Sequence, residues 1–228
     1  MELSDAEKRK ASTEEFKKEL LDLKENTEES SLKRKGDILQ ELSNLKTNMP
    51  SLQDYDLSFA DLCGVDLSDT SLCDTKCYKT LFIGADLSNC DFEDSLLVEA
   101  NFGGANLYGI DLTNADCTGA NFAKADLAES SICGANFTGV DLSCKSDLTN
   151  ADFNGANLSK ANLKEANVLD TDFSGANLRG VNLVLAENLT CEQVKSSEID
   201  RETKLPSYIK VTWLGDEEYE CEFIPENI

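Results

Sequence analysis

The sequence contains no histidine. This absence excludes histidine-based catalytic triads, cysteine–histidine nucleophile pairs and histidine metal sites. No apolar run approaches the roughly 18 residues of a membrane span. The first ten residues are polar and charged, without the apolar stretch of a secretory signal. We therefore expect a cytoplasmic protein with no catalytic residues, no metal or other cofactor, no small-molecule substrate and no membrane partner.

Basic residues are also scarce, with 21 Lys and Arg against 44 Asp and Glu and a formal net charge of −23. Because phosphate contacts need an excess of Lys and Arg, we expect no direct binding to nucleic acid. The nine cysteines show no metal-binding or redox spacing. Only Cys191 and Cys221 could plausibly form a disulfide, and the sequence leaves that pairing open.

The sequence is rich in a five-residue unit, Ala-Asp/Asn-Leu/Phe-x-x, which is clearest at 105–109, 120–124 and 156–160. The Leu/Phe position, here called the centre, recurs at every fifth residue from Leu57 to Leu142 and again from Leu148 to Leu183. A single slip of one residue separates the two series. Neither a helix nor a flat strand has a period of five. A fixed short period instead predicts a solenoid, in which each unit contacts only its neighbours.

This unit resembles that of the pentapeptide-repeat family, and the resemblance covers the chain from about residue 56 to residue 183. It implies an all-β fold, a right-handed quadrilateral β-helix with one unit on each side and about twenty residues in each coil. Residues twenty apart should then stack at the strand spacing of about 4.8 Å. We therefore expect the rings of Phe82, Phe102 and Phe122 to lie in layers, and the slip near residues 143–146 to form a bulge at one corner.

Flanking segments without the repeat should close the two ends of the solenoid. Residues 1–50 have the pattern of an antiparallel α-helical hairpin, and Ser12 with Glu15 suggests a capping box at the start of its first helix. The solenoid itself should span residues 51–187. Residues 188–228 should form a small C-terminal cap that contains a short helix and a β-hairpin. Thr190 and Gln193 suggest a second capping box there.

Charge is distributed unevenly around the predicted coil. Sorting the units into four faces places fourteen acidic residues and no Lys or Arg on two neighbouring faces, whereas acids and bases balance on the other two. Aspartate in the repeat and a need for solubility could explain such a surface. Alternatively, the acidic side could attract a basic protein partner. The residues that we expect to form a partner-binding acidic surface are Asp66, Asp86, Asp91, Asp111, Asp126, Asp147, Asp152 and Asp172.

These patterns favour a non-enzymatic scaffold that binds a protein of unknown identity through the acidic side of the rod. The family resemblance supplies an alternative. The quinolone-resistance members of the family resemble DNA in shape and charge, which implies a DNA mimic that binds a type II topoisomerase such as DNA gyrase.

An apolar patch is expected on the neutral half of the rod. Its residues flank centres in two adjacent coils and should point outward: Tyr78, Leu81, Ile83, Leu96 and Val98. Exposed patches of this kind often mark contact sites. Two hypotheses remain open for the helical hairpin. Either it folds back onto this patch through Phe16, Leu20, Ile38 and Leu42, or it plugs the first coil of the solenoid.

Overall fold

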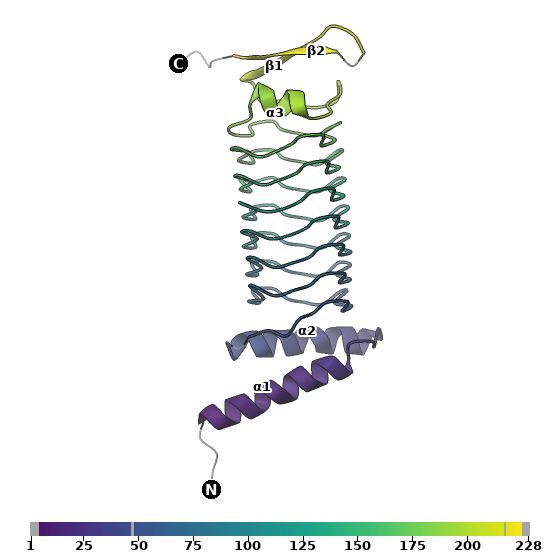
Figure 1. Cartoon of the computed structure of the whole chain (residues 1–228), viewed down its shortest axis with the longest axis vertical. Coiled ribbons are helices and arrows are strands. Elements are labelled where there is room, and N and C mark those ends of the chain that lie inside the picture. The colour runs from purple at the N-terminus through teal and green to yellow at the C-terminus, as the bar shows by residue number, and fades with distance from the viewer. Residues whose placement is uncertain (1–4, 47, 217, 225–228) are drawn as a thin grey trace.

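The computed structural model describes residues 5–46, 48–216 and 218–224, with the side chains of residues 5–10 left aside. It shows a rod of stacked coils with helices at one end and a small sheet at the other (Figure 1). The elements along the chain are α1 (Asp5–Asp22), α2 (Glu29–Asn44), α3 (Cys191–Ser196), β1 (Ile209–Trp213) and β2 (Tyr219–Phe223). The stacked coils lie between α2 and α3, so the chain is a β-helix solenoid with a cap at each end.

Each coil takes twenty residues. Parallel β-bridges join residues twenty apart, as from Asp56 to Lys76 and from Lys76 to Leu96, and four such ladders run along the rod. The backbone N–H of Leu57, for example, donates to the carbonyl of Lys76 at 2.7 Å. Within each unit the chain turns through a left-handed residue two positions after the centre, with φ of 64° at Gly104 and 57° at Asp69. Glycine is frequent at this position because it adopts positive φ without steric cost.

The centres meet along the axis of the coil. The rings of Phe82 and Phe102 stack with centroids 4.9 Å apart and planes 8° apart, and Phe102 and Phe122 stack at 4.6 Å and 6°. The small residue two before a centre also points inward, as Ala100 does, where it is 1% exposed. The expected layering of aromatic centres is therefore confirmed, and the alanines leave the space that the larger side chains fill.

The one-residue slip is absorbed at a corner, as expected. Cys144 and Lys145 both have left-handed backbone conformations, with φ of 63° and 71°. The buried Ser146 hydroxyl donates to the carbonyl of Leu142. Bridges that span this bulge join residues 21 apart, such as Asp126 and Asp147, and beyond it the spacing returns to 20, as from Asp147 to Asn167. The insertion therefore lengthens one corner without shifting the register of the stacked centres.

Helix α2 lies across the open end of the first coil, and α1 packs on its far side (Figure 1). Three contacts fix α2 to the coil: Gln40 donates to the carbonyl of Cys63, Ser43 accepts from the backbone N–H of Asp66, and Lys35 donates to the carbonyl of Asp56. Gly36 lets the helix approach closely, because a Cβ at that position would lie 3.2 Å from the Cβ of Ala60. The helical hairpin is thus a plug for the solenoid.

The alternative in which the hairpin folds back onto the apolar patch is wrong. The side chains that were expected to dock are buried at the end of the rod instead, with Leu20, Ile38 and Leu42 all 0% exposed. The open first coil would otherwise expose its own core, so covering it removes apolar surface that has no other partner. The expected helix start at Ser12 is also wrong, because α1 already begins at Asp5.

Lys35 is a fully buried cation in the plug. Its ammonium group donates hydrogen bonds to the carbonyls of Lys24, Asn26 and Asp56 at 2.9–3.1 Å. It also lies 5.9 Å from the centre of the Tyr55 ring. Burial lowers the pKa of Lys35, opposed by the charges of Asp56 and Glu25. One lysine therefore connects the loop between α1 and α2 with the first coil.

We predict that Lys35→Met loosens the plug. The substitution keeps most of the apolar stem but removes the donor from three carbonyls, which should cost about 2–4 kcal/mol. Amide hydrogen exchange across α2 would then accelerate while exchange in the middle coils stays unchanged. Lys33→Met, at an exposed position of the same helix, is the matched control. Equal protection of α2 in both variants would contradict this role for Lys35.

The C-terminal cap has the expected short helix and β-hairpin. Thr190 and Gln193 form the capping box at the start of α3, which confirms that prediction. Strands β1 and β2 pair antiparallel, from Ile209 opposite Phe223 to Trp213 opposite Tyr219. The sheet lies over α3 at the end of the rod (Figure 1).

Two kinds of contact fasten this cap. Cys191 in α3 and Cys221 in β2 form a disulfide, with Cα atoms 5.6 Å apart, so the pairing that the sequence left open is present. The hydroxyl of Tyr208 donates to the carbonyl of Ala186 at 2.7 Å, and that of Tyr219 donates to the carbonyl of Val194 at 2.9 Å. The hairpin is thereby tied to the last coil as well as to α3.

Candidate functional site

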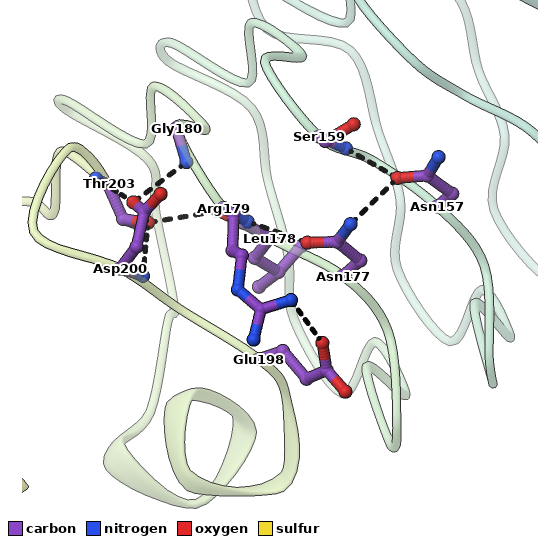
Figure 2. Close-up of polar contacts among 9 residues, drawn as sticks. All are labelled: Asn157, Ser159, Asn177, Leu178, Arg179, Gly180, Glu198, Asp200 and Thr203. Carbon is purple, nitrogen blue, oxygen red and sulfur yellow. Dashed lines mark hydrogen bonds and ion pairs between the residues drawn. The ribbon is translucent and has the colours of Figure 1, made fainter. Parts of the chain in front are cut away.

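The Asp/Asn position before each centre has a structural role throughout the solenoid. At Asn157 the side-chain carbonyl accepts the backbone N–H of Ser159 at 3.1 Å and the side-chain amide of Asn177, one coil further on, also at 3.1 Å (Figure 2). The first bond closes the turn and the second links neighbouring coils. Aspartate can make the first bond, but only asparagine can donate the second.

The eight aspartates predicted as an acidic partner-binding surface all make the first of these bonds. Each accepts, through Oδ1, the backbone N–H two residues further on, at 2.8–3.1 Å. All eight are exposed or half-buried. These carboxylates therefore close turns of the backbone and also give the surface its charge. The sequence pattern alone did not distinguish these two roles.

The pKa values reflect these two roles. Hydrogen bonds from Ser174 lower the pKa of Asp172 below its ordinary value. The exposed Glu93 shows the opposite effect: its pKa is raised mainly by the charge of Asp94, then by slight desolvation and by the charges of Asp111, Asp91 and Asp74. Like charges thus crowd one another around Glu93 on this side of the rod.

One cluster on the acidic side has the ligand types of a metal site. Among the residues that the structure describes, one potential ligand atom each from Cys73, Asp91 and Glu93 lies within 4.8 Å of the others. Burial, followed by the hydrogen bond that the thiol donates to Asp74 and by the charges of Asp74, Asp91 and Glu93, raises the pKa of the Cys73 thiol to about 11. A metal ligand must be the thiolate, so a metal ion bound here would have to displace the thiol proton.

The apolar patch lies on the other half of the rod, as its residues predicted. Tyr78, Leu81, Ile83 and Leu96 are 36–46% exposed, and Val98 is half-buried. Phe59, which the sequence reasoning missed, extends the patch: it is 62% exposed and its ring meets that of Tyr78 edge-to-face at 5.3 Å. The sequence could have placed Phe59 in the patch, because this residue follows the centre Leu57 on the same face as Tyr78, one coil earlier.

Comparison with known proteins identifies the family. The family model described as pentapeptide repeats matches in 8 copies over residues 51–89, 76–114, 110–143 and 145–183. These segments include more than half of the chain, so the protein belongs to the pentapeptide-repeat family. No curated protein matches the chain.

Several solved structures are similar in fold. HetL, a pentapeptide repeat protein involved in heterocyst differentiation regulation from the cyanobacterium Nostoc sp. strain PCC 7120, is 29% identical with a TM-score of 0.50, and the match covers 60% of this chain and 71% of HetL. QnrB1, a plasmid-mediated fluoroquinolone resistance protein, is 23% identical with a TM-score of 0.32, covering 67% of this chain and 81% of QnrB1.

Among the described helices, none combines the length and the apolarity that crossing a bilayer requires.

Proposed function

We propose that this protein is a non-enzymatic interaction scaffold that binds a basic protein partner through the acidic side of its rod. The observation that supports the proposal is the placement of fourteen acidic residues, with no Lys or Arg, on two adjacent faces of the solenoid. The proposal takes the coil to be right-handed and quadrilateral, as the family resemblance implies. A stiff, one-sided negative surface attracts a positively charged partner at long range and orients it on contact.

The geometry of the acidic side suits a partner with regularly spaced bases. Asp91 and Asp111 are joined by a β-bridge, as are Asp152 and Asp172, so carboxylates recur along one ladder. Neighbouring strands lie about 4.8 Å apart. Each carboxylate uses Oδ1 to close its own turn, which fixes the side chain before any partner arrives. A partner would therefore lose little additional side-chain entropy from the scaffold on binding.

The test removes charge without removing the structural hydrogen bond. Asparagine offers the same Oδ1 acceptor as aspartate, and the repeat already uses it at Asn106 and Asn167. Replacing the eight aspartates of the acidic surface by Asn changes the net charge from −23 to −15 and should leave the fold intact. The matched control replaces Asp56, Asp61, Asp116 and Asp141, on the neutral half, by Asn.

Affinity capture from a cell extract at about 0.15 M salt, where the Debye length is about 8 Å, compares the three proteins. Basic proteins retained by the wild type and the control should be lost from the eight-fold variant, by about tenfold or more. Far-ultraviolet circular dichroism and thermal unfolding establish that the variants are folded. Equal capture by the eight-fold variant and the wild type would overturn the proposal.

A DNA mimic that binds a type II topoisomerase is the second candidate, and the same charge asymmetry favours it. It makes a narrower prediction, because the wild type should inhibit DNA supercoiling and should compete with DNA for the enzyme. The eight-fold Asn variant should do neither. A scaffold for another basic protein predicts no effect on supercoiling by either protein.

A further inference from the structure

The C-terminal cap joins a firmly held helix to a weakly held β-hairpin. Helix α3 has its own bonds to the solenoid, because the side-chain amide of Gln193 donates to the carbonyls of Val168 and Thr171 at 2.9 and 2.8 Å. Directly after α3 the chain rejoins a ladder of the coil, where Glu198 forms a parallel bridge with Asn177. Helix α3 is therefore fixed to the last coil independently of the hairpin.

The hairpin has little packing of its own. Of the ten residues in strands β1 and β2, only Ile209 is buried. Tyr208, directly before β1, anchors the base of the hairpin to the last coil, and its ring lies 5.9 Å from that of Phe223, which is 64% exposed. An isolated two-stranded hairpin is marginally stable in water. This hairpin therefore depends on how it is attached to α3 (Figure 1).

The polar attachments beyond this base lie at or near the surface. The hydroxyl of Tyr219 donates to the carbonyl of Val194 at 2.9 Å. The exposed Arg201 donates to the carbonyl of Gly215 at 2.9 Å, and its guanidinium lies 5.1 Å from the centre of the Trp213 ring. Hydrogen bonds contribute modestly to stability when water competes for the same groups. These contacts position the hairpin but hold it weakly.

The disulfide between Cys191 and Cys221 is the covalent attachment. It joins α3 to β2 across 30 positions of the sequence. A crosslink restricts the open conformations of the segment that it closes, and the effect grows with the length of that segment. Both cysteines are half-buried, whereas Cys77, Cys90 and Cys117 are buried in the core. A reductant in solution can therefore reach the disulfide more easily than the core thiols.

We propose that the C-terminal hairpin is a redox-controlled latch, which a dithiol reductant opens while the solenoid stays folded. A thiolate of the reductant attacks one sulfur of the Cys191–Cys221 disulfide, the sulfur–sulfur bond breaks, and the departing cysteine thiolate takes up a proton. The second thiol of the reductant then attacks its own sulfur in the mixed disulfide and releases the other cysteine, which is also protonated. Two electrons and two protons pass to the protein, and the dithiol becomes a disulfide.

Opening the latch changes the surface at this end of the rod. The inner side of the sheet carries Val211, Trp213 and Tyr219, which are half-buried and pack against the core while the disulfide is intact. Without the crosslink, the equilibrium between the docked and the open hairpin shifts toward the open form. Helix α3, the coils and the acidic side keep their contacts, so the inference does not depend on the proposed function.

The first test compares the oxidised full chain with the chain reduced by dithiothreitol, without denaturant. Amide hydrogen exchange in β1 and β2 should accelerate by about tenfold or more on reduction, while exchange in α3 and the middle coils stays unchanged. The fluorescence of Trp213, the only tryptophan of the chain, should move to longer wavelength and return on reoxidation. Unchanged exchange in the two strands would overturn the proposal, and so would equal acceleration in α3 and the coils.

Two variants assign the effect to this disulfide. Cys191→Ser combined with Cys221→Ser should exchange rapidly in both strands without reductant and should not respond to dithiothreitol. The matched control, Cys63→Ser combined with Cys144→Ser, removes two exposed thiols of the rod and should respond as the wild type does. A response of the strands in the first variant, or none in the control, would show that other thiols cause the change and would overturn the proposal.

The second test uses the reciprocity between docking of the hairpin and formation of the disulfide. A docked hairpin keeps the two sulfurs together, so weakening its contact with α3 should make the disulfide easier to reduce. Tyr219→Phe removes one hydrogen bond and should lower the ratio of reduced to oxidised dithiothreitol at half-reduction by roughly fivefold. Tyr108→Phe, at an exposed position of the acidic side, is the control and should leave this ratio unchanged.

Alkylation of the thiols of Cys191 and Cys221, read by mass spectrometry, measures the reduced fraction in each mixture. The same ratio at half-reduction in the Tyr219 and Tyr108 variants would show that hairpin docking and the disulfide are not coupled, which would overturn the latch.

Discussion

Phe102→Ala is expected to destabilise the protein by about 3–5 kcal/mol, the range for removing a buried aromatic ring. The ring lies between Phe82 and Phe122, with centroids 4.9 and 4.6 Å away, and meets the edge of Phe92 at 6.4 Å. Stacked coils hold the backbone at a fixed spacing, so the neighbours cannot collapse into the space left by the ring. The loss of stability should therefore include both the transfer free energy of the buried ring and the cost of the cavity that it leaves.

Chemical unfolding followed by circular dichroism measures this loss. Tyr108→Ala, in the next unit along the chain, removes an aromatic ring that is 47% exposed and should cost less than about 0.5 kcal/mol. One variant removes an aromatic ring that points into the core and the other removes one that points outward, so the pair tests the contribution of burial. If both variants lost similar amounts of unfolding free energy, burial of the centres would not be the main source of the stability of the coil.

Alkaline pH is expected to destabilise the protein through its buried thiols. Burial is the main cause that raises the pKa of Cys77 and Cys90 to about 12, and it raises that of Cys117 well above its ordinary value. In the unfolded chain these thiols ionise near pH 8.5. Above that pH the unfolded state binds fewer protons than the folded state, so the free energy of unfolding falls as pH rises.

The expected slope is steep. Each thiol contributes about 1.4 kcal/mol per pH unit, so three together remove about 4 kcal/mol per unit between pH 8.5 and their folded pKa values. Lys35 acts in the opposite direction, since its pKa is lowered by burial and its contribution rises with pH. One lysine does not offset three thiols. Burial also raises the pKa of Tyr55 and Tyr219, which adds to the loss above about pH 10.

Urea unfolding at about pH 8, 9 and 10 tests this account, with the starting pH chosen just below the thiol range. The variant that carries Cys77→Ala, Cys90→Ala and Cys117→Ala should be less stable at pH 8, because it loses buried volume, but its stability should fall much less with pH. The test therefore compares how steeply the free energy of unfolding falls with pH in the two proteins, and not their stabilities at one pH. Parallel slopes in the two proteins would contradict a role for the core thiols.

The coil could be predicted from the sequence because its information is local and repeated. A period of five, with Ala two before each centre, determines which side chains point inward, and twenty residues per coil places Phe82, Phe102 and Phe122 in one stack. The corner bulge was predictable for the same reason, since the ladders on either side of it had to remain in register. The division of the surface into an acidic and a neutral half follows directly from this geometry.

The position of the helical hairpin could not be predicted in the same way. Its amphipathic pattern correctly indicates that Leu20, Ile38 and Leu42 are buried, but not against which surface, because the apolar patch and the open first coil both offered apolar area. Lys35 was missed because its burial depends on three carbonyl groups that converge only in the folded structure. The disulfide between Cys191 and Cys221 likewise depends on how α3 and β2 approach each other in space.

We propose that the acidic half of the rod, and not the neutral half, is the surface that binds a basic partner. Carbodiimide labelling of carboxylates, read by mass spectrometry with and without a captured partner, tests it residue by residue. Asp66 and Asp126 on the acidic side and Asp61 on the neutral side are all exposed. We predict that binding protects Asp66 and Asp126 and leaves Asp61 unchanged. Protection of Asp61 while Asp66 and Asp126 remain fully labelled would contradict the account.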